Sequence, residues 1–290
     1  MKINYEFSIC EGIVLITFIL CVVSKKLTLN GALSALIVGT LISFAGWNYL
    51  VILYAFFISS TIATDIHKHI KTTLYGNVYA KEKKRNAIQV LCKGLFPSFI
   101  SVIIAYYKPM LSNKCINFLS GIYIGYFISA NADTWASELG IASTKEPILI
   151  TTFKIVPKGT NGGVTLFGTC MSICGGCFIS IVEIICNAIK NRTNDITLYM
   201  ISTKIILGCV IGFIGSLLDS IIGAVFQMTI YNTKTKQIVD THEYMSISKT
   251  QNDIYYINGK DILSNSQVNL ITCITSSFIC GVLFYLKYVY

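Results

Sequence analysis

Charged residues are scarce in this chain of 290 residues. Only 13% of its residues are charged, whereas about 25% are charged in an average soluble domain. Apolar residues make up 53% of the chain, and they gather in stretches close to the roughly 20 residues that a helix needs to cross a bilayer. This balance excludes an ordinary soluble domain and predicts one multi-pass membrane domain over residues 1–290.

The cysteines lack the pattern of a disulfide framework. There are 11 of them, an odd number, and most lie inside apolar stretches, where cysteine behaves as a small hydrophobic residue. Cys170, Cys174 and Cys177 share one helical face but have no histidine nearby, so helix packing is favoured over a metal site. The apolar run 13–23 is followed by Ser24 and two lysines rather than by a small-residue cleavage site, which favours a retained anchor over a signal peptide.

The apolar stretches predict an all-α polytopic protein with about eight transmembrane helices. The count ranges from six to eight, because the fourth stretch is short enough to be re-entrant and only Ala45 and Gly46 separate the second from the third. The eight predicted spans are 8–23, 29–44, 47–64, 95–107, 115–130, 164–189, 198–226 and 269–286. Between them lie a basic loop, 65–93, and a polar loop, 227–268, which is expected to form a small hairpin or a lid.

Basic residues are distributed unevenly between the two ends of these spans. The formal net charge is +9, and most of the 23 lysine and arginine residues fall in the four loops on one side. The positive-inside rule identifies that side as the inner, cytoplasmic-equivalent face. Because the basic residues do not cover one soluble surface, the charge indicates orientation in a lipid bilayer, and nucleic acid is not expected as a partner.

Two carboxylates lie five residues apart where the fifth span reaches the inner face. Asp133 and Glu138 belong to segment 131–140, with the sequence NADTWASELG. An unpaired carboxylate at a membrane boundary is costly, so partners or a cation should neutralise these groups. The alternative is structural: Asp133 would cap a helix, and Glu138 would simply be solvated.

A glycine-rich segment, 156–165, precedes the sixth span and has the sequence VPKGTNGGVT. Closely spaced glycines allow backbone amides to point toward an anion, and a lysine adds positive charge. The spacing is not that of a Walker motif, and a plain loop-to-helix turn is an equally good interpretation. The candidate phosphate-binding residues are Lys158, Gly159, Asn161, Gly162 and Gly163.

The seventh span carries an aspartate, Asp219, among apolar residues near its inner end. An ionisable group at that depth is a functional candidate, because it has to face a cavity, a counter-ion or the interior of the bundle. Gly208, Gly212 and Gly215 on the same span are expected to pack against another helix.

Asp133, Glu138, Lys158 and Asp219 come from three elements that the topology brings to one membrane face. Carboxylates that share a divalent cation, beside a glycine-rich loop and a lysine, can bind a nucleotide's phosphates and assist phosphoryl transfer. The same groups can also bind a transported ion or anion.

Segments 131–140, 156–165 and 215–227 resemble the signatures of the transmembrane protein 19 family, whose plant members include phytyl-phosphate kinase. Segments 86–91 and 265–270 resemble its flanking motifs. The resemblance implies that CTP phosphorylates an isoprenoid monophosphate. Distant similarity to dolichol kinases and phosphatidate cytidylyltransferases implies Mg²⁺, with Asp133 and Asp219 as its ligands.

The leading hypothesis is therefore a CTP-dependent, Mg²⁺-assisted kinase of prenyl alcohols or prenyl phosphates. In this hypothesis Asp133 and Glu138 are catalytic, the segment around Lys158 binds the nucleotide, and an isoprenoid lipid lies between helices. An internal membrane, of the endoplasmic reticulum or another organelle, is the expected location. The alternatives are an ion-coupled carrier, although no clear inverted repeat is present, and a non-catalytic membrane scaffold.

Overall fold

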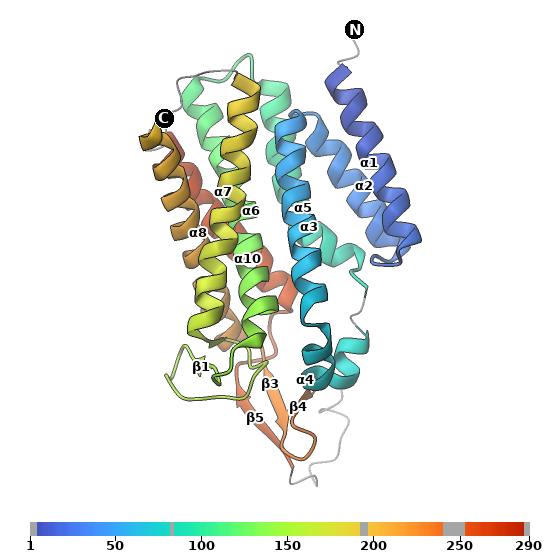
Figure 1. The fold of residues 1–290 in the computed structure, drawn as a ribbon, viewed down its shortest axis with the longest axis vertical. Helices are drawn as coiled ribbons and strands as arrows, with labels where there is room; N and C mark the ends of the chain where they lie inside the picture. The colour runs from blue at the N-terminus through green and yellow to red at the C-terminus, as the bar shows by residue number, and fades with distance from the viewer. Residues whose placement is uncertain (1–4, 82–83, 192–196, 240–252, 287–290) are drawn as a thin grey trace.

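The computed structural model describes residues 5–81, 84–191, 197–239 and 253–286. It is an elongated bundle of long helices with a short helix and small strands at one end (Figure 1). The helices are α1 (Tyr5–Val23), α2 (Leu29–Ser43), α3 (Trp47–Ile66), α4 (Lys68–Lys81), α5 (Ala87–Tyr107), α6 (Asn113–Leu139), η1 (Gly140–Ala142), α7 (Leu166–Asn191), α8 (Leu198–Phe226) and α10 (Asn265–Tyr285). The strands are β1 (Ile148–Leu149), β2 (Gly163–Val164), β3 (Thr229–Asn232), β4 (Gln237–Val239) and β5 (Ile254–Asn258).

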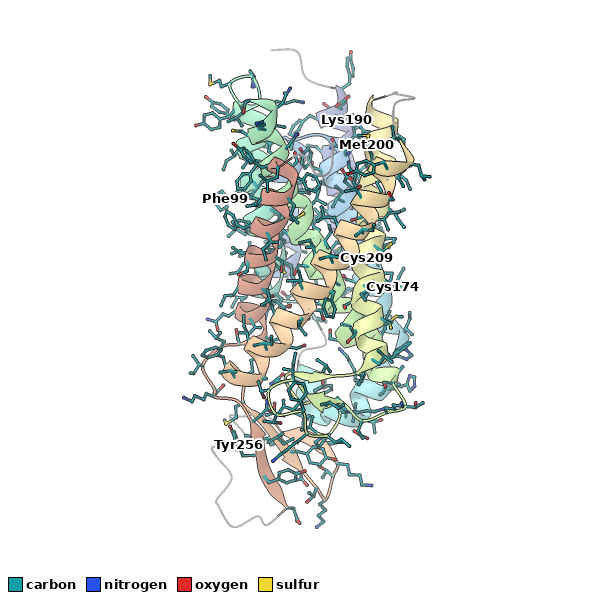
Figure 2. All side chains as sticks on the ribbon, turned by 90° about the vertical axis from the view of Figure 1, so that its left-hand side faces the viewer. Phe99, Cys174, Lys190, Met200, Cys209 and Tyr256 are labelled. Carbon is teal, nitrogen blue, oxygen red and sulfur yellow. The ribbon has the colours of Figure 1, made fainter. Side chains whose placement is uncertain are left out.

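The two ends of the bundle contain different elements. Helix α1 begins and α10 ends near the same end, and α4 and the strands lie at the opposite end (Figure 1). We call the end with α4 and the strands the inner end and the other the outer end. Figure 2 likewise separates Lys190 and Met200, near the outer end, from Tyr256 in the strands.

Within the described residues, six helices are long and apolar enough to cross a membrane: α1, α3, α5, α7, α8 and α10. Helix α2 is apolar but has only 15 residues, and α6 has 27 residues without meeting the same hydropathy criterion. Both run along the bundle beside the other six (Figure 1). The structure thus confirms the all-α multi-pass fold, with a helix count inside the predicted range of six to eight.

The fourth predicted span is longer in the structure than in the prediction. Helix α5 begins at Ala87 rather than near residue 95, and it runs to Tyr107 as a full crossing and not as a re-entrant segment. Its start is set by a capping box, in which the Asn86 side chain accepts from the Gln89 amide and the Gln89 side chain accepts from the Asn86 amide. The first helical turns therefore include residues that the sequence pattern assigned to the basic loop, Lys93 among them.

Helix α6 occupies the centre of the bundle, and every residue from 121 to 132 is buried. Because this helix touches other helices on all sides, it does not need the apolar surface of a lipid-facing span. This placement explains how a span with low hydropathy can run through the bundle and end in the polar segment 131–140.

Small residues allow the helices around α6 to approach closely. A Cβ added to Gly176 of α7 would lie 2.2 Å from the carbonyl oxygen of Gly208 on α8, and one added to Gly212 would lie 3.1 Å from Cβ of Ala132 on α6. Backbones this close are typical of small-residue contacts in membrane bundles. The predicted packing role of the α8 glycines is confirmed.

Short β-structure organises the inner end. Strand β3 pairs antiparallel with both β4 and β5, and β1 pairs with β2. Part of the 227–268 loop thus forms a β-hairpin, which was one of the two predicted possibilities, while residues 240–252 lie outside the described part. Helix α4 forms within the basic loop 65–93, over about half of its length.

Candidate functional site

A cavity of about 940 Å³ lies toward the inner end of the bundle. Helices α3 to α8, the N-terminal end of α10 and the segment between η1 and α7 all contribute to its lining. The structure brings the predicted site residues together, because all of them line this cavity: Asp133, Glu138, Lys158, Gly159, Asn161, Gly162, Gly163 and Asp219.

Asp133 of α6 and Asp219 of α8 face one another because of the helix contact one turn away. A Cβ on Gly215 would lie 2.2 Å from the Ser129 hydroxyl, so α6 and α8 are in close contact at that level. Residues four apart lie on the same helix face, and Asp133 and Asp219 each follow their contact residue by four. Both side chains are half-buried, and the two carboxylates interact electrostatically.

Lys93 is a functional candidate that the sequence interpretation missed. It interacts electrostatically with both Asp133 and Asp219, and its Nζ donates to Oδ1 of Asn269 on α10 at 2.8 Å. The signal that reveals it is the capping sequence at Asn86, which starts α5 early enough to place this lysine in the helix. Two carboxylates and one ammonium from three different helices therefore share the cavity wall.

Asp219 has a further partner on α10, since the Thr272 hydroxyl donates to its Oδ2 at 3.3 Å. Within the described residues, no group of three or more His, Cys, Asp or Glu side chains is positioned to hold a metal ion. A pair of carboxylates nevertheless fits Mg²⁺, which is commonly held by one or two carboxylates together with substrate phosphates and water. Asp133 and Asp219 would supply those two ligands.

Glu138 is paired in this structure. One of its carboxylate oxygens, Oε1, lies 2.7 Å from Nζ of Lys71 on α4, and the two side chains are only 14% and 16% exposed. Arg85 is close enough to interact with Glu138 as well; burial lowers the pKa of the Arg85 guanidinium, and the Glu138 and Asp65 carboxylates oppose that effect. Glu138 therefore links α6 to α4 and carries a neutralising partner, as a carboxylate at this boundary should.

The glycine-rich segment is held firmly against the end of α8. Gly162 has a φ of +77°, and a Cβ there would lie 2.3 Å from Cβ of Ala224. Gly159 has a φ of +88°, and a Cβ there would lie 2.9 Å from the Tyr75 hydroxyl. Both positions therefore require glycine for conformation and for space. The side chain of Lys158, which precedes Gly159, donates to the backbone carbonyl of Ser143, the residue that follows η1.

Asn161 connects this segment to the strands of the inner end. Its backbone amide donates to the Thr229 hydroxyl at 3.1 Å, and its carbonyl accepts from the Asn258 side chain at 2.8 Å. The amides of Thr160 and Gly163 also donate to carbonyls within the protein. An anion in this part of the cavity would depend on the Lys158 side chain and on the remaining amides of the segment.

The three cysteines on α7 do not share the packing role that their spacing in the sequence predicts. Cys170 and Cys174 are exposed on the bundle surface, and only Cys177 is half-buried. In a membrane, this surface faces lipid.

Several known proteins are similar to this chain. The chain is 36% identical to Protein PGR of Arabidopsis thaliana over 170 residues, which cover 56% of this chain and 58% of PGR. It is 32% identical to an uncharacterized membrane protein of Methanocaldococcus jannaschii over 172 residues, covering 58% of this chain and 67% of that protein. It is 28% identical to Protein VTE6, chloroplastic, of Arabidopsis thaliana over 158 residues, covering 54% of this chain and 46% of VTE6.

No solved structure matches the chain. The family described as integral membrane protein DUF92 matches it over residues 12–277, which include all three motifs and every residue of the candidate site. The resemblance that the motifs indicated is thereby confirmed, and the lipid bilayer is the protein's environment. The chain belongs to the DUF92 family of integral membrane proteins.

Proposed function

We propose that this protein is a Mg²⁺-assisted kinase that transfers a phosphoryl group from CTP to a prenyl alcohol or a prenyl phosphate such as phytyl phosphate. The observation that carries the proposal is the cluster of Asp133, Asp219 and Lys93 on the wall of one inner-end cavity. Phosphoryl transfer depends mainly on positioning and on charge stabilisation, and this cluster has both signs of charge for that purpose.

In this proposal the acidic residues bind the metal ion and the basic residues bind the phosphates. Bound Mg²⁺ would neutralise phosphate charge, and Asp133 and Asp219 would hold it. Lys93, fixed by its hydrogen bond to Asn269, and Lys158 would bind phosphate oxygens of the two substrates. An oxygen of the acceptor attacks the γ-phosphorus, the bond to the β-phosphate oxygen breaks, and CDP leaves with the electron pair of that bond. When the acceptor is a prenyl alcohol, its hydroxyl proton passes to solvent.

Glu138 has a narrower role in this proposal than the sequence suggested. Its ion pair with Lys71 positions α4 over the cavity, where Tyr75 meets Gly159. We therefore assign Glu138 to positioning, whereas Asp133 is the carboxylate of segment 131–140 that touches the substrates.

The deciding experiment measures phosphate transfer from radiolabelled CTP and ATP, with Mg²⁺, to a panel of prenols and prenyl phosphates. Detergent-purified wild type is compared with the Asp133→Asn variant. Transfer by the wild type, preferring CTP and lost in the variant, supports the proposal and identifies the acceptor. No transfer and no nucleotide binding by folded wild type would contradict it and favour an ion-coupled carrier.

We further propose an internal membrane as the location, in the endoplasmic reticulum or another organelle. The similarity to VTE6, whose name describes it as chloroplastic, supports an organelle. Fractionation of native membranes with an antibody to the chain tests this proposal, and recovery mainly in the plasma membrane would contradict it.

A further inference from the structure

The inner-end cavity extends beyond the polar site into the apolar part of the bundle. An arm of it continues between α1, α2 and α3, helices that stand together on one side of the molecule (Figure 1). Its lining is aliphatic and aromatic: Val14, Phe18, Leu36, Leu53, Phe56 and Phe57. We call this part of the cavity the apolar arm.

The depth of the apolar arm follows from α3. Asp65, near the inner end of α3, and Leu53, farther along it, both line the cavity. At 1.5 Å per residue, the helix between them rises about 18 Å. The arm therefore reaches well into the layer that hydrocarbon chains occupy in a bilayer.

Hydroxyl groups along the apolar arm are used by their own helices. Thr17, Thr61 and Thr64 each donate to the carbonyl four residues earlier, at 2.9, 2.7 and 2.9 Å. Side chains that bond back to their own helix in this way have little left to offer a ligand in the arm. The wall is thus suited to a hydrocarbon and poorly suited to a polar solute.

The helices converge at the far end of the arm. A Cβ on Gly39 of α2 would lie 3.0 Å from Val14 of α1, so these two helices touch there. The Tyr54 side chain of α3 lies close enough to Thr17 of α1 to interact with it, at a similar depth. These contacts close the far end of the arm, so they limit how far a hydrocarbon chain can extend from the polar site.

We propose that the apolar arm binds the single hydrocarbon chain of a lipid phosphate, and that Leu53 limits the length of that chain. Lys93 and Lys158 line the polar end of the same cavity and complement the charge of the phosphate. Ligand pockets of about 300–1,000 Å³ hold one drug-sized molecule. A cavity of about 940 Å³ that also receives a nucleotide has room for one chain and not for two. The inference rests on the proposed function for the identity of the headgroup.

Binding without nucleotide tests this inference separately from kinase activity. Native mass spectrometry of the full chain in detergent would compare phytyl phosphate with the shorter geranyl phosphate. We expect Leu53→Trp to weaken binding of phytyl phosphate at least tenfold and to leave geranyl phosphate unchanged. The matched control is Ile58→Trp on the same helix, where the side chain is 54% exposed and outside the cavity lining; it should alter neither ligand.

Unchanged affinity of Leu53→Trp for phytyl phosphate would overturn the inference. A second measurement keeps it testable if that variant does not fold: a phytyl phosphate analogue with a diazirine at the chain end should label peptides of α1, α2 or α3 in the wild type. Labelling confined to the lipid-facing surface of the bundle would count against binding in the apolar arm.

The outcomes separate the two proposals. Binding of phytyl phosphate without phosphate transfer would refute only the proposed kinase activity. Transfer with an unaltered chain-length preference in Leu53→Trp would refute only the proposed role of the apolar arm.

Discussion

Two clusters of charge lie toward opposite ends of the bundle, and they differ in how their charges are partnered. Near the outer end, Glu183 of α7 accepts from Lys204 of α8 at 2.8 Å, with the two side chains 5% and 9% exposed. The Asn187 side chain also donates to Glu183, and the adjoining cavity measures only about 50 Å³. At the inner end, Asp133 and Asp219 face a cavity of about 940 Å³.

The comparison shows that buried charge alone does not identify a functional site. Glu183 and Lys204 neutralise each other and leave little space, so their arrangement is suited to joining α7 to α8. At the inner end, Asp133 and Asp219 outnumber the single ammonium of Lys93, so the cluster keeps a net negative charge beside a large cavity and is suited to binding a cation. The space beside each cluster and the sign of its charges therefore separate the two roles.

The largest effect is expected from Asp219→Asn. The change removes one of two facing carboxylates, and loss of a preorganised charge at a reacting centre commonly costs about 10²- to 10³-fold in rate. We expect CTP-dependent transfer to fall by about that factor. Thermal unfolding in detergent should be unchanged or slightly improved, because repulsion from Asp133 disappears. A variant with full activity would place the chemistry elsewhere.

Glu183→Leu should act on stability and not on catalysis. Removing one partner of a buried ion pair commonly costs about 3–5 kcal/mol, because the remaining charge loses the attraction of that partner. We expect a clear loss of folded protein with normal activity per folded molecule. The double variant Glu183→Leu/Lys204→Met should recover much of that stability. A selective loss of activity in folded Glu183→Leu would show that the outer cluster has a function of its own.

Gly162→Ala tests whether the inner site depends on its supporting segment. The added methyl group meets Ala224 and forces an unfavourable φ, a strain on the order of 1–3 kcal/mol. We expect lower activity together with easier proteolysis of segment 156–165. Gly12→Ala is the control, because a Cβ at Gly12 has no atom within 4 Å, and it should behave as the wild type.

The smallest effect is expected at the ion pair between Lys71 and Glu138. Breaking it with Lys71→Ala should lower activity less than Asp219→Asn does, because the pair positions α4 and does not touch the reacting groups. The charge swap Lys71→Glu/Glu138→Lys should restore part of the activity if Glu138 only positions α4. Loss of activity as complete as in Asp219→Asn, without rescue by the swap, would make Glu138 catalytic.

The prediction from sequence was most successful where the signal is local. Apolar length along each span predicted the multi-pass helical fold, and small residues on α8 predicted its close contacts. It failed at α5, where the polar first turns hid a helix that begins with the capping box at Asn86. It also did not predict that α6 lies at the centre of the bundle. Low hydropathy is found both in a helix surrounded by other helices and in a loop, so it cannot distinguish the two.

In the candidate site, too, the sequence predicted some features and the contacts between distant segments could not be predicted. Sequence alone identified Asp133 and Asp219, since an aspartate in or beside an apolar span needs a partner wherever it lies. The interaction of Lys93 with both aspartates, the pairing of Glu138 with Lys71 and the binding of Asn161 to β3 and Asn258 arise between segments far apart in the chain. No spacing within one segment encodes these contacts.

By itself, the sequence determined that this protein is a multi-pass membrane protein of the DUF92 family, with its polar motifs predicted at one face. The number of apolar residues in a span and the charge of a loop are properties of short segments, so they can be read without a fold. Only the tertiary structure decided which charges are paired, which face the cavity, and that the cavity continues along α3 as an apolar arm. The physical reason is that pairing and cavities depend on how neighbouring helices pack, and packing is set by the whole bundle.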